Sequence, residues 1–357
     1  MMKILHTADL HLSEEAPGRW ETLEELVNLA REEEVSTLVI AGDLFDRESA
    51  AEAMRPRLRE VLGGGGFQTV ILPGNHDFKV YSSGFYFGDN VYVIRDWREP
   101  VRLGGAVFWG LPHEDISLGR LAGRLREMSF LMDPEQENFL LFHGELLDTF
   151  FSRQDLGEEG EQRYMPARLS FFEPLPAGYI LAGHFHSRFA AWQAPGGILF
   201  IYPGSPVAVT RRETGRRKVN LVAPGEAPRE VTLNSFHYEE LTITLDPFTD
   251  QDPLAELDRI LSDLHPSAGV LLAVEGLFDS SAAGMSETEM ATAIKKKTAP
   301  VCSGEPVLNF IDVHHILEDD LFKKFRAGLE ETGHPPELKR EIMEMVIRAF
   351  KGVKQCS

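Results

Sequence analysis

The sequence has few cysteines and no long apolar run. Among its 357 residues are 2 cysteines, Cys302 and Cys356, whose wide separation fits neither a disulfide framework nor a thiolate metal site. No stretch of about 18 apolar residues occurs, which argues against a membrane-spanning helix. The first residues, MMKILHTADLHL, lack the apolar segment of a secretory signal. We therefore expect a cytoplasmic protein that does not associate with membranes.

Basic residues are also in short supply. The 36 lysines and arginines are outnumbered by 56 aspartates and glutamates, which gives a formal net charge of −20. A surface of that charge repels the phosphates of nucleic acids unless metal ions or local basic patches compensate it. The charge therefore weighs against a nucleic-acid substrate without excluding one. The length and the 43% of hydrophobic residues are sufficient for one large core and a smaller second domain.

In the first part of the chain, short apolar runs repeatedly end in a polar motif. Five places show this pattern: KILHTA-DLH, STLVIA-GDLFDR, QTVILP-GNHD, NFLLF-HGE and YILA-GHFH. Amphipathic helices are predicted between the first three runs, at residues 20–34 and 50–62. Strands that alternate with such helices indicate a layered α/β fold, in which ligands bind beyond the carboxyl ends of the strands. The five motifs are therefore expected to meet at one edge.

The pattern changes near residue 236. Three apolar runs alternate there with two predicted helices, and no motif of the earlier kind follows them. Two further helices end the sequence, and the last one carries an apolar stripe that suits either a core or the groove of a partner. The expected domains are a catalytic domain, a smaller α/β domain and a terminal helix pair, over residues 1–235, 236–315 and 316–357.

The polar residues of the five motifs are carboxylates, imidazoles and one amide. They are Asp9, His11, Asp43, Asn75, His76, His143, His184 and His186. Such a set without thiolates suits divalent Mn, Fe or Zn. It is too large for one catalytic ion, which needs an open position, and it fits two ions about 3.5–4 Å apart. Two ions activate a water molecule and hold phosphoryl oxygens, so the residues predict metal-assisted hydrolysis at phosphorus.

The same motifs carry a family resemblance. D-x-H, G-D-x-x-D-R, G-N-H-D, H-G-E and G-H-x-H occur in the order typical of the calcineurin-like metallophosphoesterase superfamily, which the sequence resembles over roughly its first 200 residues. The motifs AGDLFD, LPGNHD and YPGSP resemble most the SbcD-type DNA repair exonucleases, the nuclease partners of an SMC-like ATPase. The resemblance implies an α/β fold: a layered β-sandwich flanked by helices, with a smaller α/β capping domain.

The resemblance also implies a role for each motif residue. The implied ligands are Asp9, His11 and His186 for one ion, Asn75, His143 and His184 for the other, and Asp43 as the bridge between them. Manganese is the favoured metal, with iron and zinc as alternatives. His76 would act as general acid or transition-state donor, and Asp77 or Asp46 would orient it.

Three arginines are candidates for substrate binding. Arg47 follows GDLFD, as in the phosphatase branch of the superfamily, and Arg211 and Arg212 follow YPGSP. The segment 211–218 holds five cations and one acid, and it is interpreted either as a solvated turn or as a contact to a phosphate backbone.

Three functions remain open at this point. The first is a DNA exonuclease or endonuclease of SbcD-like kind that acts in DNA repair with an SMC-like ATPase. Its oligomeric state is left open, and a homodimer is one alternative. The second is a phosphodiesterase or phosphatase for small molecules, which the net charge and Arg47 favour. The third is a scaffold without activity, which we disfavour because every ligand position of the family pattern is retained.

Overall fold

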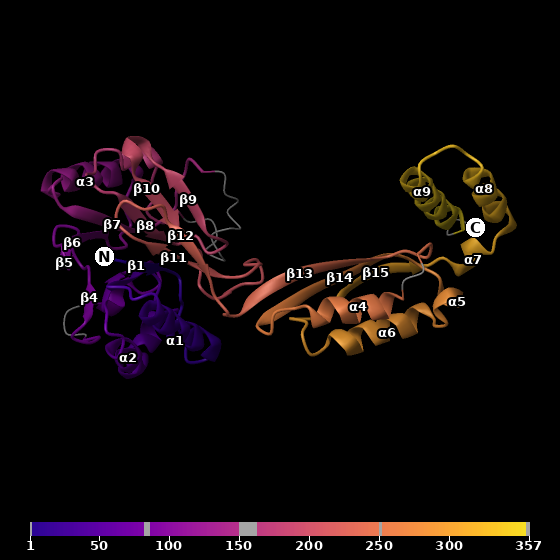
Figure 1. Ribbon diagram of the computed structural model, residues 1–357, viewed down its shortest axis with the longest axis horizontal. Helices are drawn as coiled ribbons and strands as arrows, with labels where there is room; N and C mark the ends of the chain where they lie inside the picture. The colour runs from indigo at the N-terminus through magenta and orange to yellow at the C-terminus, as the bar shows by residue number, and fades with distance from the viewer. Residues whose placement is uncertain (1, 82–85, 150–162, 250–251, 355–357) are drawn as a thin grey trace. The chain divides into compact units, whose positions relative to one another are not determined.

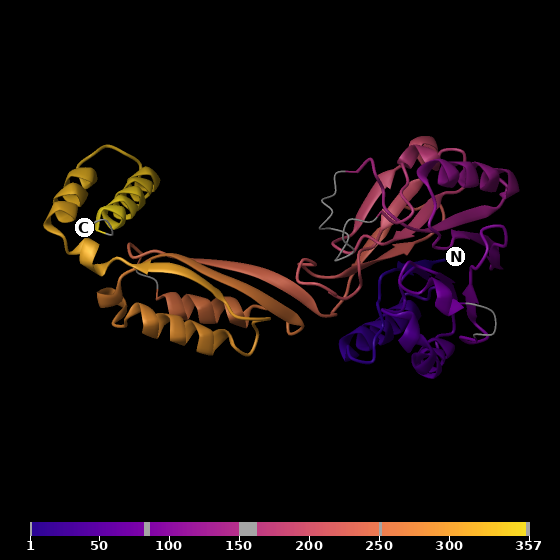
Figure 2. The ribbon, with the colours of Figure 1, turned by 180° about the vertical axis from the view of Figure 1, so that it is seen from behind.

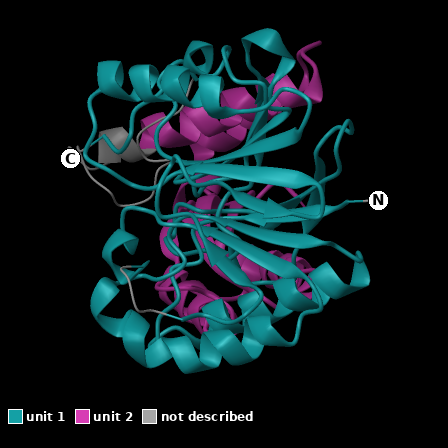
Figure 3. Ribbon diagram, turned by 90° about the vertical axis from the view of Figure 1, so that its left-hand side faces the viewer, with its two compact units in different colours: residues 1–238 teal, residues 239–357 magenta. Residues whose placement is uncertain are grey.

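The apolar runs and amphipathic segments form the strands and helices of two units. The computed structural model describes residues 2–81, 86–149, 163–249 and 252–354. The units comprise residues 1–238 and 239–357 (Figures 1 to 3). No described helix combines the length and the apolar character that crossing a membrane requires. The division into three domains that we expect from the sequence stays a prediction.

Unit 1 is built around two six-stranded sheets (Figure 1). The first has the order β12-β11-β1-β2-β3-β4, with β1 to β4 parallel; the second has the order β5-β6-β7-β8-β10-β9, with β6, β7, β8 and β10 parallel. The strands of the first sheet are β1 (Ile4–Thr7), β2 (Thr37–Ala41), β3 (Gln68–Leu72), β4 (Val91–Val93), β11 (Lys218–Val222) and β12 (Arg229–Thr232). Those of the second are β5 (Val101–Leu103), β6 (Ala106–Leu111), β7 (Glu137–His143), β8 (Tyr179–Gly183), β9 (Ala190–Gln193) and β10 (Leu199–Tyr202).

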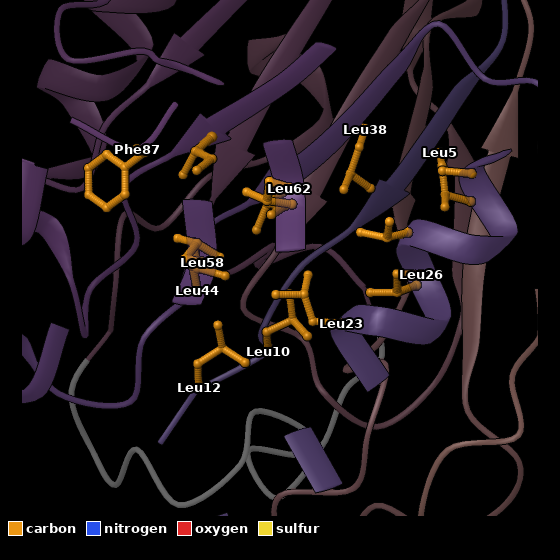
Figure 4. Packing of buried hydrophobic residues seen from close by; sticks show 14 of the residues in the cluster. Leu5, Leu10, Leu12, Leu23, Leu26, Leu38, Leu44, Leu58, Leu62 and Phe87 are labelled. Carbon is orange, nitrogen blue, oxygen red and sulfur yellow. The ribbon is translucent and has the colours of Figure 1, made fainter. Parts of the chain in front are cut away.

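Helices cover the outer faces of the two sheets. They are α1 (Pro17–Glu32), α2 (Glu48–Gly63) and α3 (Leu118–Leu131), with 3-10 turns at η1 (Phe78–Tyr81), η3 (Leu169–Phe171) and η4 (Pro195–Gly197). Successive side chains of a strand point to opposite faces. Thus Leu38 and Ile40 of β2 pack with α1 and α2, as Figure 4 shows for Leu38, whereas Val39 packs between the sheets. Strand β7 alternates in the same way, and α3 covers its outer face.

These contacts arrange unit 1 in four layers, helices on sheet on sheet on helix, which Figure 3 shows in teal. The predicted β-sandwich flanked by helices is confirmed. Because β1, β2 and β3 are parallel in one sheet and β7 and β8 are parallel in the other, the loops after these five strands can meet at one edge.

Unit 2 is a smaller α/β structure with a three-stranded sheet in the order β13-β14-β15. Its elements are β13 (His237–Leu245), which begins at the last two residues of unit 1, α4 (Pro253–Ser262), β14 (Ala268–Phe278), α5 (Ser280–Ala283), α6 (Glu287–Thr298), β15 (Val307–Asp312), α7 (His314–Leu317), α8 (Asp320–Glu330) and α9 (Pro336–Lys354). Leu257 of α4 and Met290 of α6 pack on the sheet. A second small core around Phe322 and Ile347 joins α8 and α9 to the end of β14.

Candidate metal centre

The structure brings the predicted ligands together at the shared edge of the two sheets. Each stands at or just after the end of a strand: Asp9 and His11 after β1, Asp43 after β2, Asn75 after β3, His143 at the end of β7, and His184 and His186 after β8. A hydrogen-bond contact of 2.8 Å between His143 Nδ1 and the carbonyl of Ala41 ties the end of β7 to the end of β2. All of these side chains except Asn75 are buried.

A first cluster consists of Asp9, His11 and His186, whose ligand atoms all lie within 4.8 Å of one another. The Nε2 atoms of His11 and His186 are 3.4 Å apart, and Nε2 of His186 lies 3.6 Å from Asp9 Oδ1. Two nitrogens that bind one tetrahedral ion at about 2.0–2.1 Å stand about 3.3–3.4 Å apart. The spacing of the two imidazoles therefore fits a shared metal ion.

A second cluster consists of Asp43, Asn75, His143 and His184. Nε2 of His143 lies 3.1 Å from Asp43 Oδ2 and 3.0 Å from Asn75 Oδ1, and His184 offers a ligand atom within 4.8 Å of those of Asp43 and His143. Asp43 Oδ2 also lies 3.9 Å from Nε2 of His11 in the first cluster. This position between the clusters suits the bridging role that the sequence predicts for Asp43.

The backbone at the centre adopts conformations that most residues avoid. Of the six non-glycine residues with positive φ in the described chain, four are predicted ligands: Asp9 (57°), His11 (46°), Asp43 (50°) and His184 (93°). A left-handed conformation costs such residues about 1–2 kcal/mol each. Strain of this kind persists where the surrounding structure imposes it, and it gathers at functional sites.

Two motif glycines are required because other groups approach them closely. A Cβ atom on Gly74 would lie 2.1 Å from Asp43 Oδ1, and one on Gly42 would lie 1.9 Å from His143 Nδ1. Gly42 also has a φ of +100°. The glycines in G-D-x-x-D and G-N-H-D thus make room for ligands from neighbouring loops.

The buried groups shift one another's pKa. Burial lowers the pKa of His143, but the carboxylates of Asp43 and Asp9 outweigh it and raise that pKa to about 10. Burial lowers the pKa of His11 to about 3 and raises that of Asp9 to about 6. Without ions, His143 is therefore protonated at neutral pH and compensates the charge of Asp43. His143 would lose that proton when it holds a divalent ion, because ligands bind metals in their deprotonated form.

The residues predicted to surround the leaving group are also close to the centre. A ring nitrogen of His76 lies within 4.8 Å of the ligand atoms of His11 and Asp43, and its Nδ1 lies 3.2 Å from the carbonyl of Asp46. Asp46 thus contacts His76 through its backbone. The Asp46 carboxylate is instead 3.1 Å from Nη1 of Arg19 and 3.8 Å from Nδ1 of His11.

The carboxylate of Asp77 is buried and accepts hydrogen bonds from two loops of the centre. It accepts hydrogen bonds from the backbone N–H groups of Gly74 (2.9 Å) and Phe45 (3.1 Å) and from the Tyr81 hydroxyl (3.0 Å). These bonds join the G-N-H-D loop to the G-D-x-x-D loop. That Asp77 orients His76 stays a prediction.

A cleft of about 640 Å³ opens over the first cluster and His76. Its walls are formed by His11, Arg19, Asp46, His76, Tyr164, His186, Val209, Thr210, Arg211, Arg212 and Tyr238. Arg211 and Arg212, two of the arginines predicted to bind substrate, are thus exposed at its wall. The third, Arg47, does not line this cleft; its side chain is 72% exposed, and its Nε lies 3.5 Å from Asp46 Oδ2.

Sequence reasoning missed three charged residues near the centre. Arg217 is 2% exposed and Glu213 is 1% exposed, so the interpretation of segment 211–218 as a solvated turn is wrong for these two. Burial raises the pKa of Glu213, but interactions with His186 and a hydrogen bond from Ser205 outweigh it and lower that pKa to about 2. Arg19 donates to the carbonyl of His11.

Two of the missed residues carry a weak signal in the sequence. Glu213 is the one acid in a run of cations. Arg19 lies in the first turn of α1, where the helix dipole disfavours a cation unless an anion is close. Asp46 provides that anion.

Comparison with known proteins identifies the family. The family model for calcineurin-like phosphoesterases matches residues 2–188, which is more than half of the chain. The chain belongs to this family. Membership implies a metal-dependent hydrolase, and the clusters around Asp9, His11, Asp43, His143 and His186 point to divalent ions as its cofactors.

Individual proteins are similar over part of the chain. The DNA double-strand break repair protein Mre11 of Saccharolobus solfataricus is 26% identical over 230 residues, which cover 60% of this chain and 56% of that protein. The chain thus spans little more than half the length of this relative. TT1561 of Thermus thermophilus has a TM-score of 0.43 and 14% identity over 61% of this chain and 93% of its own. A dimetal phosphatase from Danio rerio has a TM-score of 0.39 and 12% identity over 62% and 91%.

Proposed function

We propose that this calcineurin-like phosphoesterase is a nuclease that cuts DNA phosphodiesters with two divalent metal ions, of the SbcD-like kind that acts in DNA repair. The observation that carries the proposal is the convergence of both ligand clusters with His76, beside a cleft that is lined by His11, His186 and His76 and has arginines at its wall. The identity to an Mre11 protein extends over 230 residues, beyond the 187 positions of the family match, and supports DNA as the substrate.

The metal ions would be held by the first cluster (Asp9, His11, His186) and the second cluster (Asp43, Asn75, His143, His184). We favour manganese because oxygen and imidazole ligands without thiolates suit it, with iron and zinc as alternatives. Bound ions would supply Lewis acidity toward water and the phosphoryl oxygens. Because the four ligands with positive φ are held by the surrounding loops, the chain presents its donor atoms before an ion arrives.

The remaining residues of the cleft would handle the proton and the phosphates. A hydrogen bond between Nδ1 of His76 and the Asp46 carbonyl fixes the imidazole, which can then hold a proton at its other ring nitrogen for the departing oxygen. Arg211 and Arg212 would contact the phosphates on either side of the scissile bond, an interaction that positions DNA without reading its sequence.

The proposal is tested with metal-stripped full-length protein that is reloaded with Mn²⁺ and incubated with labelled linear and hairpin DNA. We expect Mn²⁺-dependent cleavage. The variant His76→Ala should keep two ions by elemental analysis and lose activity by about 10²-fold or more. His314→Ala, in unit 2, is the matched control and should cleave like the wild type. Two bound ions without cleavage of any DNA end or hairpin would contradict the proposal.

A second candidate is a phosphodiesterase or phosphatase for small molecules, which the net charge of −20 favours. The same reloaded protein distinguishes the two when it is incubated with cyclic nucleotides and bis(p-nitrophenyl) phosphate. Turnover of cyclic nucleotides without DNA cleavage would support this candidate. The model ester alone does not decide, because two-metal sites of either kind can hydrolyse it.

We also propose that an SMC-like ATPase binds the terminal helices α8 and α9. Leu321 and Met345 are apolar residues of these helices that are 65% and 61% exposed. Replacing both with glutamate should abolish co-purification with an ATPase encoded beside this protein, whereas exchanging the exposed Glu337 of α9 for glutamine should not. Retention of the complex by the double variant would place the contact elsewhere.

A further inference from the structure

The segment between β10 and β11 folds back beneath His186. The backbone N–H of Ser205 donates to the His186 carbonyl over 3.0 Å, and this contact returns the chain to the loop that carries the ligand. Further along, the same segment places Thr210 and Arg211 at the wall of the cleft. The segment therefore connects the loop that carries His186 to the wall of the cleft.

Glu213 is a buried residue of this segment to which several neighbouring groups donate hydrogen bonds. Its carboxylate accepts hydrogen bonds from the Ser205 hydroxyl (2.6 Å), from the backbone N–H groups of Val209 (2.9 Å) and Thr210 (3.1 Å), and from the Thr210 hydroxyl (3.0 Å). Oε1 of the same carboxylate lies 3.4 Å from Nδ1 of His186. Five groups are thus arranged around one carboxyl group whose residue is 1% exposed.

Arg217 supplies a matching positive charge beneath the same loop. Its guanidinium donates to the carbonyls of Ser205 and Ser187, both over 3.0 Å, and to the carbonyl of His186. It also donates to the Ser205 hydroxyl over 3.2 Å. The guanidinium of Arg217 therefore holds the backbone of the His186 loop and of the returning segment at Ser205. The buried carboxylate of Glu213 faces the His186 ring itself.

We propose that Glu213 is a positioning residue that holds the proton of neutral His186 on Nδ1, so that the lone pair of Nε2 faces Asp9 and His11 in the first cluster. An imidazole binds a metal through the nitrogen without a proton, and the partner of the other nitrogen decides which one that is. A carboxylate in this place also makes the ligand nitrogen more basic. The proposal holds for a DNA substrate and for a small phosphoester.

The other histidines of the centre are supported differently. Nδ1 of His143, in the second cluster, faces the neutral carbonyl of Ala41 at 2.8 Å. Nδ1 of His11 has no hydrogen-bond partner among the residues that the structure describes, and the Asp46 carboxylate lies 3.8 Å from it. Loss of the Glu213 charge should therefore weaken the ion of the first cluster and leave that of the second unchanged.

The test measures Mn²⁺ binding to the metal-free, full-length protein by calorimetry. Glu213→Gln should weaken one of the two ions by about 10- to 100-fold and leave the affinity for the other unchanged. The matched control is Thr210→Val, which removes one hydrogen bond to the same carboxylate with little change in volume and leaves the contact to His186. It should bind both ions like the wild type. Equal affinities of Glu213→Gln and the wild type for both ions would overturn the proposal.

A second measurement does not depend on any Glu213 variant folding. In the metal-free wild type, the ¹⁵N chemical shifts of His186, assigned by the loss of their signal in His186→Gln, report which ring nitrogen carries the proton. We expect protonation of Nδ1 and an unprotonated Nε2 at a pH where the ring is neutral. Protonation of Nε2 instead would overturn the proposal, whatever the substrate of the enzyme is.

Discussion

Replacement of Gly42 by alanine should damage both the fold and the metal centre. Gly42 stands between Ala41, whose carbonyl contacts His143, and the predicted bridging ligand Asp43. Its φ is +100°, and an added Cβ would lie 1.9 Å from Nδ1 and 2.4 Å from Cγ of the His143 ring. Neither the backbone nor the imidazole can move away without disturbing a ligand.

The cost can be worked from these two effects. A left-handed conformation costs an alanine about 1–2 kcal/mol. Forcing an extra methyl group into a packed interior typically costs a further 1–3 kcal/mol or so. We therefore expect Gly42→Ala to lower the unfolding free energy of the metal-free protein by about 2–5 kcal/mol. Because His143 belongs to the second cluster, binding of the ion there should weaken as well.

The measurements are urea unfolding and Mn²⁺ calorimetry, with Gly123→Ala as the control. Gly123 lies inside α3, and a Cβ there would meet nothing within 4 Å. That exchange should raise stability by about 0.5–1 kcal/mol, as usual for glycine to alanine within a helix, and leave metal binding unchanged. If Gly42→Ala matched this control in both measurements, our account of close packing at the second cluster would be refuted.

Three further predictions concern pH, metal ions and salt. Burial lowers the pKa of His6 from 6.5 to about 3, so the unfolded chain takes up a proton that the folded protein excludes. Between pH 6 and pH 4, His6 should lower the unfolding free energy of the wild type by about 1.4 kcal/mol per pH unit as the pH falls. In His6→Leu this contribution should be missing, so the unfolding free energy should depend less steeply on pH. Equal pH dependences of the two proteins would contradict the prediction. Mn²⁺ at 100 times its Kd should stabilise the wild type by about 2.7 kcal/mol per ion in urea unfolding, and Asp9→Asn should lose one such increment; an undiminished gain would count against the first cluster. In DNA-binding titrations, the double variant Arg211→Gln/Arg212→Gln should reduce the slope of log affinity against log salt by about 2, whereas Arg47→Gln should not; the reverse pattern would move the phosphate contacts to Arg47.

Much of the architecture follows from local patterns in the sequence. Helical periodicity places α1 and α2 to within a few residues, and the pattern after residue 236 predicts the order of β13, α4, β14, α6 and β15 and the two terminal helices α8 and α9. The sequence does not predict helix α3, because Gly119 and Gly123 reduce its intrinsic propensity. Packing of Leu121, Leu125 and Met128 against the second sheet outweighs that deficit.

The candidate site also has a part that the sequence predicts and a part that it does not. Its ligands could be named because each follows a strand directly, and because parallel strands of a sheet end at a common edge. The residues that support those ligands could not be named from the sequence. Glu213 lies 27 positions from His186, and Arg19 lies 27 positions from Asp46, so only the folded chain shows that they meet. The contact of His76 with Asp46 is made to the backbone carbonyl, so the type of residue at position 46 does not predict it.

The positive φ angles of Asp9, His11, Asp43 and His184 have a consequence for engineering. Glycine would adopt these conformations without penalty. Replacing any of the four by glycine would therefore remove the backbone strain that the native residues need in order to keep their donor atoms in place. Directed evolution for heat resistance alone would thus reward variants that erode this pocket. Catalysis has to be part of the selection if a thermostable derivative is to remain an enzyme.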